Sequence, residues 1–217
     1  KNRMRAELAT EVFRPRYTPN TMIARSRVNE QLRLMTDTGA AADSFGTAHG
    51  GTGEVGAAIA GIEMVAMADL SLMVKAGVQW GLFGGAVENL GTERHHKAYV
   101  RRIIDLDLLG CFAMTETGHG SDVQSLETTA TYDPATQEFV VHSPTPTARK
   151  DYIGGAAETA RVAAVFAQLI TDGEGHGVHC LIVPNRDEDG NDLPGVTTAD
   201  CHYKGGLPGV DNGRIMF

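Results

Sequence analysis

The chain changes character near residue 110, and this change restricts the fold more than any other feature of the sequence. Before it, apolar residues recur at the three-to-four-residue spacing of helices. After it, β-branched residues and two-residue alternation dominate, which is typical of strands. A helical half followed by a strand half favours two segregated subdomains over alternating βα units. We therefore predict an α+β fold with domains at 1–109 and 110–217.

The first half is predicted to contain helices at 1–36, 55–74, 75–90 and 92–107. Pro15 and Pro19 interrupt the first of them, and Thr92 is a suitable N-cap for the last. The helix at 55–74 carries Glu63 and Asp69 as its only charged residues, so we expect it to be buried on most sides.

The second half is predicted to contain strands at 127–132, 139–142, 162–170 and 178–183. Polar turns at 133–136 and 187–192 separate some of these strands. The chain ends in an apolar run at 215–217 that indicates a strand cut short, and it lacks an initiator methionine. We therefore expect it to be a piece of a longer protein.

Composition excludes several classes of protein. Among the 217 residues, 42% are hydrophobic and 21% charged, which is ordinary for a globular protein, and the net charge of −8 argues against a nucleic-acid surface. The longest apolar run, 76–87, is too short to span a membrane. Three cysteines without a signal peptide favour a reducing compartment, so we expect a cytoplasmic location.

A glycine-rich loop follows an apolar run at 111–114, which is also readable as a strand. The stretch 111–122 reads CFAMTETGHGSD, with Thr115 and Ser121 at the two ends of the loop and Gly118 and Gly120 between them. Glycines let backbone N–H groups approach and face a ligand. The arrangement suits a ligand with one polar ring edge and one phosphate group, although an ordinary glycine turn has the same composition.

Other motifs carry less weight. The match to G-x-G-x-x-G at 51–56 has no strand before it, so we interpret its glycines as serving a tight loop and helix packing. The histidines and cysteines at 176–180 and 201–202 fit no standard zinc spacing, and we predict no metal site. No sequence pattern indicates a catalytic triad, and we assign no catalytic residue within this chain.

Several ordered motifs together resemble the acyl-CoA oxidase branch of the acyl-CoA dehydrogenase superfamily, in its actinobacterial form. They are TETGHGSD at 115–122, LETTATY at 126–132, ARKDYIGG at 148–155 and GVDNGRI at 209–215, preceded by DLSLMVKAGVQW at 69–80 and LGTERHH at 90–96. The resemblance implies a helical N-terminal domain and a middle domain that is a β-barrel or β-sandwich, truncated here at its C-terminal end.

The resemblance also implies FAD as the cofactor. Thr115 would face the pyrimidine edge of the flavin, and Gly154 would let the backbone approach the ring. Gly118, Gly120 and Ser121 would lie along the diphosphate or along the nearby part of the acyl-CoA. Tyr152 would pack against the flavin, although a core tyrosine is an equal alternative. Asp151 departs from the family pattern, since it replaces an aromatic residue and so puts side-chain stacking in doubt.

Members of the family convert acyl-CoA to trans-2-enoyl-CoA in fatty-acid β-oxidation. Oxidases then pass the electrons to O₂, and dehydrogenases pass them to an electron-transfer flavoprotein; both alternatives stay open, as does a non-catalytic binding or assembly protein on the same scaffold. The family's catalytic Glu belongs to a C-terminal domain, and Glu116 does not match it. We expect the fragment alone to be inactive and to bind FAD weakly or not at all, and the full-length protein to form a homo-oligomer.

Overall fold

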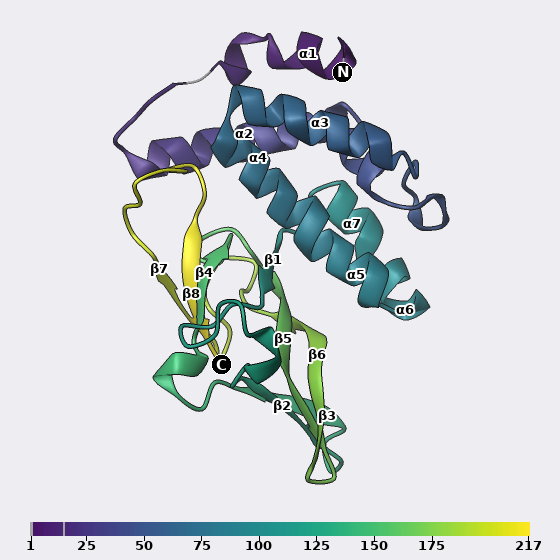
Figure 1. The fold of residues 1–217 in the computed structure, drawn as a ribbon, viewed down its shortest axis with the longest axis vertical. Helices are drawn as coiled ribbons and strands as arrows, with labels where there is room; N and C mark the ends of the chain where they lie inside the picture. Colours follow the sequence, from purple (N-terminus) through teal and green to yellow (C-terminus); the bar gives the residue numbers. More distant parts are fainter. Residues whose placement is uncertain (1, 15) are drawn as a thin grey trace. The chain divides into compact units, whose positions relative to one another are not determined.

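A computed structural model describes residues 2–14 and 16–217, which form two compact units (Figure 1). The helical unit comprises residues 1–109 and 202–211, and the strand unit comprises 110–201 and 212–217. The chain thus first crosses from one unit to the other at 109–110, near the position where its residue pattern changes from helical to strand-like. The return of 202–211 to the helical unit is a feature that no sequence pattern indicates.

The helical unit is built from helices of mixed type. They are α1 (Asn2–Leu8), η1 (Glu11–Phe13), α2 (Thr21–Asp37), η2 (Ala40–Ser44), η3 (Thr47–His49), α3 (Val55–Ala68), α4 (Leu70–Ala76), η4 (Gly77–Gly84), α5 (Gly85–Leu90), α6 (Glu93–His95), η5 (His96–Val100) and α7 (Arg101–Ile104). Of these, η4 and η5 are π-helical, and η1, η2 and η3 are 3₁₀ turns. The last helical stretch begins after Thr92 as expected and ends at Ile104, short of the predicted end.

The helix predicted at 55–74 is divided in two. The Asp69 carboxylate accepts hydrogen bonds from the N–H groups of Ser71 (2.8 Å) and Leu72 (3.3 Å), and so caps the start of α4. The preceding helix, α3, ends at Ala68, immediately before this cap. The expectation of burial on most sides is wrong for α3. Val65 is fully buried, whereas Met67 is 81% exposed.

The helix over 70–90 is continuous through α4, η4 and α5, and it forms the centre of the unit. Gln79 donates to the carbonyl oxygens of Ile103 (3.3 Å) and Leu108 (2.8 Å), and the Trp80 indole donates to Ile103 (3.1 Å). By length and composition this is the one helix of the described residues that is able to cross a membrane, which the shorter run seen in the sequence did not suggest. However, 56% of its most apolar window is buried, as in a core helix.

The returning segment 202–211 is fixed to the helical unit by a buried ion pair. The Lys75 ammonium lies 2.6 Å from Asp211 Oδ1, and the two side chains are 6% and 0% exposed. The Gly209 N–H also donates to the Ser71 hydroxyl at 3.2 Å. A Cβ atom at Gly209 would lie 2.4 Å from a Val28 methyl group, so this close approach requires glycine.

The strand unit contains two sheets. Its strands are β1 (Gly110–Ala113), β2 (Thr129–Asp133), β3 (Glu138–His142), β4 (Lys150–Gly154), β5 (Val162–Thr171), β6 (Glu174–Pro184), β7 (Thr197–Asp200) and β8 (Asn212–Met216), with 3₁₀ turns η6 (Val123–Ser125) and η7 (Pro146–Ala148). In the first sheet β5 pairs in parallel with β1 and β2 and antiparallel with β6, and β3 is antiparallel to β2. The second sheet has the order β4-β8-β7.

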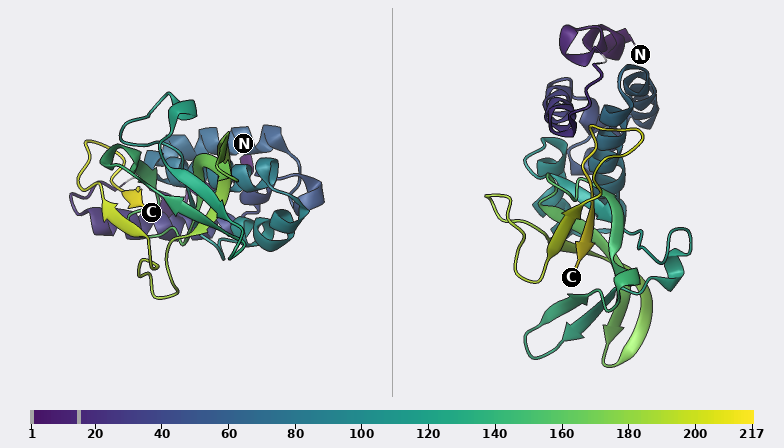
Figure 2. Two further views of the ribbon diagram at one scale, coloured as in Figure 1. Left: turned by 90° about the horizontal axis from the view of Figure 1, so that it is seen from below. Right: turned by 90° about the vertical axis from the view of Figure 1, so that its left-hand side faces the viewer.

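Small and β-branched side chains fill the core of the strand unit. The buried cluster is drawn from both sheets and from the turn after β4; it comprises Cys111, Ala113, Ile153, Ala156, Ala160, Ala163, Val165 and Ile215. Two sheets with a shared core confirm the sandwich-like expectation, and the described strands form no closed barrel. Figure 2 shows the β2–β3 and β5–β6 hairpins extending together from this core.

Candidate functional site

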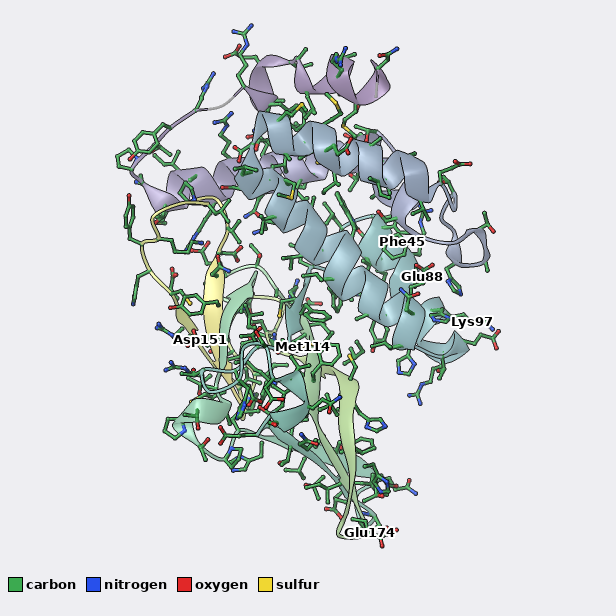
Figure 3. All side chains as sticks on the ribbon, viewed as in Figure 1. Phe45, Glu88, Lys97, Met114, Asp151 and Glu174 are labelled. Carbon is green, nitrogen blue, oxygen red and sulfur yellow. The ribbon has the colours of Figure 1, made fainter. Side chains whose placement is uncertain are left out.

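The glycine-rich loop leaves β1 and runs antiparallel to the start of β4. The Asp151 N–H donates to the Thr115 carbonyl (3.1 Å), and the Thr117 N–H donates to the Arg149 carbonyl (2.9 Å). Figure 3 labels Met114 and Asp151, which lie on these two neighbouring segments of the strand unit. The structure therefore brings together the two motifs that the sequence singles out at 115–122 and 148–155.

Part of the loop backbone is consumed within the protein. The N–H groups of Glu116 and His119 donate to each other's carbonyl oxygens (3.0 and 3.2 Å), and the Gly118 N–H donates to the Thr147 carbonyl (2.9 Å). A Cβ atom at Gly118 would lie 3.0 Å from Thr147 Cβ. Gly118 therefore serves close packing, and its N–H group is not free for a diphosphate.

A second set of loop donors is unused. The N–H and hydroxyl of Thr115, and the N–H groups of Gly120 and Ser121, have no hydrogen-bond partner within residues 2–14 and 16–217. Gly120 and Ser121 are exposed, Thr115 is half-buried, and a Cβ atom at Gly120 would meet nothing within 4 Å. These groups can donate to an external acceptor without breaking any bond of the fold.

Tyr152 and Gly154 lie on β4 beside this loop. Tyr152 is 65% exposed and has a φ of +58°, at an irregularity between Lys150 and Ile153 in the pairing with β8. A left-handed backbone is costly for a non-glycine residue and is often found at functional sites. Gly154 is half-buried and pairs with Asn212. The tyrosine is therefore not the core residue that the sequence left as an alternative.

A fully buried ion pair lies under the loop. Lys150 Nζ is 3.0 Å from Glu116 Oε1, and both side chains have no exposed surface. Burial raises the pKa of Glu116, but hydrogen bonds from Thr128, Glu127 and Lys150 outweigh it and hold this pKa below its ordinary value. Burial lowers the pKa of Lys150, and Glu116 partly offsets this effect. A carboxylate held in this way is ionised and unsuited to taking a proton from a substrate.

Asp151, the departure from the family pattern, is the centre of a polar network. Its carboxylate accepts hydrogen bonds from Thr117 (3.0 Å), Arg149 (3.0 Å) and Arg214 (3.1 Å), and the residue is 5% exposed. Burial raises its pKa, and the hydrogen bonds from Thr117 and Arg149 outweigh that effect and lower it. Asp151 therefore ties β4 to the loop and to β8 and is not available for stacking.

The other motifs that the sequence analysis considered lie at 51–56, 176–180 and 201–202. The residues before the 51–56 motif form η2 and η3, with no strand, and a Cβ atom at Gly51 would lie 2.0 Å from the Phe45 carbonyl oxygen. No group of three among the histidines and cysteines at 176–180 and 201–202 comes together in the described chain.

One cluster of potential metal ligands was not suggested by sequence. Glu116, His119 and Glu127 place one ligand atom each within 4.8 Å of one another. Glu116 is already bound to Lys150, and Glu127 accepts a hydrogen bond from the Thr145 hydroxyl at 2.6 Å. We interpret the cluster as part of the loop's hydrogen bonding.

The helical unit contains a separate cavity of about 570 Å³. Its lining is mostly apolar and comes chiefly from α3, η2 and the helix over 70–90; it comprises Met4, Met35, Ala40, Asp43, Ser44, Glu54, Ala57, Ala58, Ile59, Gly61, Ile62, Ala76, Gly77, Trp80 and Gly81. This volume is in the range of small-molecule sites.

Comparison with known proteins agrees with the motifs. Residues 111–217 match the family model of the acyl-CoA dehydrogenase middle domain. Peroxisomal acyl-coenzyme A oxidase 3 of Arabidopsis thaliana is 48% identical over 156 residues, which are 72% of this chain and 23% of that protein.

Solved structures give the same result. Acyl-CoA oxidase 1 of Yarrowia lipolytica matches all of this chain and 31% of its own, with a TM-score of 0.88 and 31% identity. Acyl-CoA oxidase-2 of Caenorhabditis elegans, solved with FAD, ascaroside-CoA and ATP, matches 71% of this chain and 24% of its own, with a TM-score of 0.64 and 32% identity. The chain thus spans between about a quarter and a third of these proteins. It belongs to the acyl-CoA dehydrogenase superfamily, on the acyl-CoA oxidase branch.

Proposed function

We propose that this chain is part of an acyl-CoA oxidase, which uses FAD to convert acyl-CoA to trans-2-enoyl-CoA in β-oxidation and transfers the electrons to O₂. The observation that carries the proposal is the pair of unused donors on Thr115, held beside the exposed Tyr152. The oxidase names of the relatives support O₂ over an electron-transfer flavoprotein as the acceptor.

The residues fit a flavin in most of the expected positions. The free N–H and hydroxyl of Thr115 suit the polar pyrimidine edge, and the free N–H groups of Gly120 and Ser121 suit the diphosphate. Tyr152 offers an exposed ring, and Gly154 offers backbone without a side chain. Gly118 contributes through packing only. When bound, FAD supplies the hydride acceptor for the β-hydrogen of the acyl group.

Donors fixed before the reaction are the main contribution of this chain to the chemistry. The pyrimidine edge gains negative charge when the ring is reduced, and preorganised donors stabilise such charge without reorganising. Glu116 is unsuited to be the base that removes the α-proton, because it is buried and ion-paired, and we matched no other acid of this chain to the family's catalytic Glu. We place that base in the rest of the protein.

The experiment is made on the purified full-length protein. We expect a yellow cofactor in its absorbance spectrum, and one H₂O₂ for each enoyl-CoA formed in air. Enoyl-CoA formed only with an artificial acceptor would indicate the dehydrogenase alternative, and absence of both cofactor and product would favour a non-catalytic protein. The isolated 217-residue chain should give no enoyl-CoA, and its formation would contradict our placement of the base.

Two further assignments are proposals about the whole protein. The plant relative is described as peroxisomal, whereas the cysteine content of this chain favours the cytoplasm, and fractionation of cells that express the full-length protein decides between them. We also propose a homo-oligomer, which light scattering on the full-length protein tests.

A further inference from the structure

The buried Lys150–Glu116 pair contacts the residues on either side of Thr115, and the proposed chemistry assigns no role to this contact. The Lys150 ammonium offers three hydrogens, and three oxygen acceptors surround it: the Met114 carbonyl at 3.0 Å, Glu116 Oε1 at 3.0 Å and the Phe166 carbonyl at 2.6 Å. The lysine is therefore fully satisfied, and its position is determined by groups on β5 and on the loop.

Two of these acceptors lie on the immediate neighbours of Thr115 in the chain. Lys150 thus holds the loop at Met114 and at Glu116, and the next residue of β4, Asp151, donates its N–H to the carbonyl between them, that of Thr115 (3.1 Å). Three consecutive loop residues are fixed from two residues of β4. The N–H and hydroxyl of Thr115 are the groups that this arrangement leaves unused.

Glu116 extends the same anchoring to the far end of the loop. Its carboxylate accepts the N–H of Glu127 (2.7 Å) and of Thr128 (3.0 Å), immediately before β2. The pair therefore connects β4, β5 and both ends of the segment that carries Gly120 and Ser121. Neither residue can move alone, because the other would be left as an unpaired buried charge.

We propose that Lys150 and Glu116 are a positioning pair for the cofactor site, which sets the location of the Thr115 donors without touching the ligand. The inference rests on the proposed function, since it assigns the pair to the same flavin site. It differs from a purely structural role in one respect: loss of the pair should weaken cofactor binding even when the protein remains folded.

The experiment compares three variants of the full-length protein. Lys150→Met removes the ammonium, and Lys150→Met with Glu116→Gln removes both charges and so avoids an unpaired buried carboxylate. Lys75→Met is the matched control, because it breaks the other buried lysine–carboxylate pair, in the helical unit. The measurements are the FAD dissociation constant of the folded apoprotein, the spectrum of the bound flavin, and hydrogen exchange of the segment 114–121 without cofactor.

We expect the FAD dissociation constant to rise at least about tenfold in both Lys150 variants, since small misplacements of fixed groups have large effects, with faster exchange in 114–121. Lys75→Met should lower the melting temperature but change the FAD dissociation constant by less than about twofold.

The proposal is overturned if the double variant binds FAD as the parent does with unchanged exchange, or if Lys75→Met weakens binding equally. If the parent binds no FAD, the proposed function fails instead, and the exchange measurement still decides whether the pair fixes the loop.

Discussion

At the scale of single residues, the Thr115 hydroxyl is the donor whose removal tests the site most directly. Thr115→Val keeps the shape and the N–H group and removes the hydroxyl. We expect kcat of the full-length protein to fall on the order of tenfold to a hundredfold. The decrease should be smaller than if both donors of Thr115 were lost, because its N–H group remains. Thr115→Ser should stay near the parent in the same steady-state assay. Equal kcat for the valine variant and the parent would remove the hydroxyl from the site.

Tyr152 allows a second prediction in which stability and cofactor binding separate. Tyr152→Gly removes the strain of a left-handed backbone, which stabilises the folded state by about 1 kcal/mol. Glycine also gives the unfolded chain greater conformational freedom, and this destabilises the folded state by a similar amount. The ring is 65% exposed, so little packing is lost. We therefore expect nearly unchanged stability in urea but weaker FAD binding by titration.

Gln137 provides the matched control for this prediction. It has a φ of +59° in the turn between β2 and β3. Gln137→Gly should change stability in urea by a similar amount and leave FAD binding unaltered. A loss of FAD affinity in the Gln137 variant, or none in the Tyr152 variant, would contradict a role for the tyrosine ring.

The sequence predicted correctly which residues of a single motif lie close together. It placed Thr115, Gly120 and Ser121 in one loop and connected that loop with 148–155, and the structure sets these segments side by side; the cofactor contacts themselves stay predictions. It did not predict the inward N–H of Gly118 or the Lys150–Glu116 pair. Both depend on partners about thirty residues away in the chain. A local sequence pattern does not show which residues of two distant segments lie opposite each other.

At the scale of elements, the division between α3 and α4 depends on one cap. Asp69→Ala removes the acceptor for two N–H groups at the start of the helix over 70–90. We expect a loss of about 1 kcal/mol in the free energy of unfolding. Asp69→Asn keeps a capping oxygen and should recover most of it. Urea denaturation, followed by the fluorescence of the single tryptophan, Trp80, measures both variants.

The same cap explains where the prediction of elements was wrong. Apolar residues continue at helical spacing through 55–74, so periodicity alone does not separate two helices from one. A charged residue in that run was interpreted as an interior position, although it is the N-cap. The four strands predicted at 127–132, 139–142, 162–170 and 178–183 correspond to β2, β3, β5 and β6, because alternation and turn residues bound them. For example, β5 extends over Val162–Thr171 against an expected 162–170. In contrast, β4 and β7 were not predicted.

At the scale of the whole molecule, the described chain divides into two units, and the segment 202–211 returns to the helical unit although no sequence pattern indicates this return. That return depends on the pairing of Lys75 with Asp211. These residues lie far apart in sequence and in segments with no common motif. A short excursion of this kind depends on individual contacts, which composition does not reveal.

The strand unit should also be sensitive to acid. In the strand unit, hydrogen bonds and cations outweigh burial and lower the pKa of Glu116 and Asp151 below 4.5 and 3.8, their respective ordinary values. A carboxyl whose pKa is lower in the folded state contributes stability that is present above its unfolded pKa and is lost as the pH falls through its folded pKa. The strand unit is therefore expected to lose stability progressively as the pH drops below about 4.5.

Hydrogen exchange at a series of pH values, corrected for the intrinsic rate, tests this expectation. Protection of β5 and β8 should fall between pH 5 and the acid limit, on the order of tenfold for each pKa unit by which a carboxyl is lowered. Asp151→Asn should lower protection in the strand unit at pH 7 and flatten its acid dependence, because the residue no longer titrates. An acid dependence as steep in this variant as in the parent would mean that Asp151 does not contribute, and that the lowered pKa reflects contacts which persist in the unfolded chain.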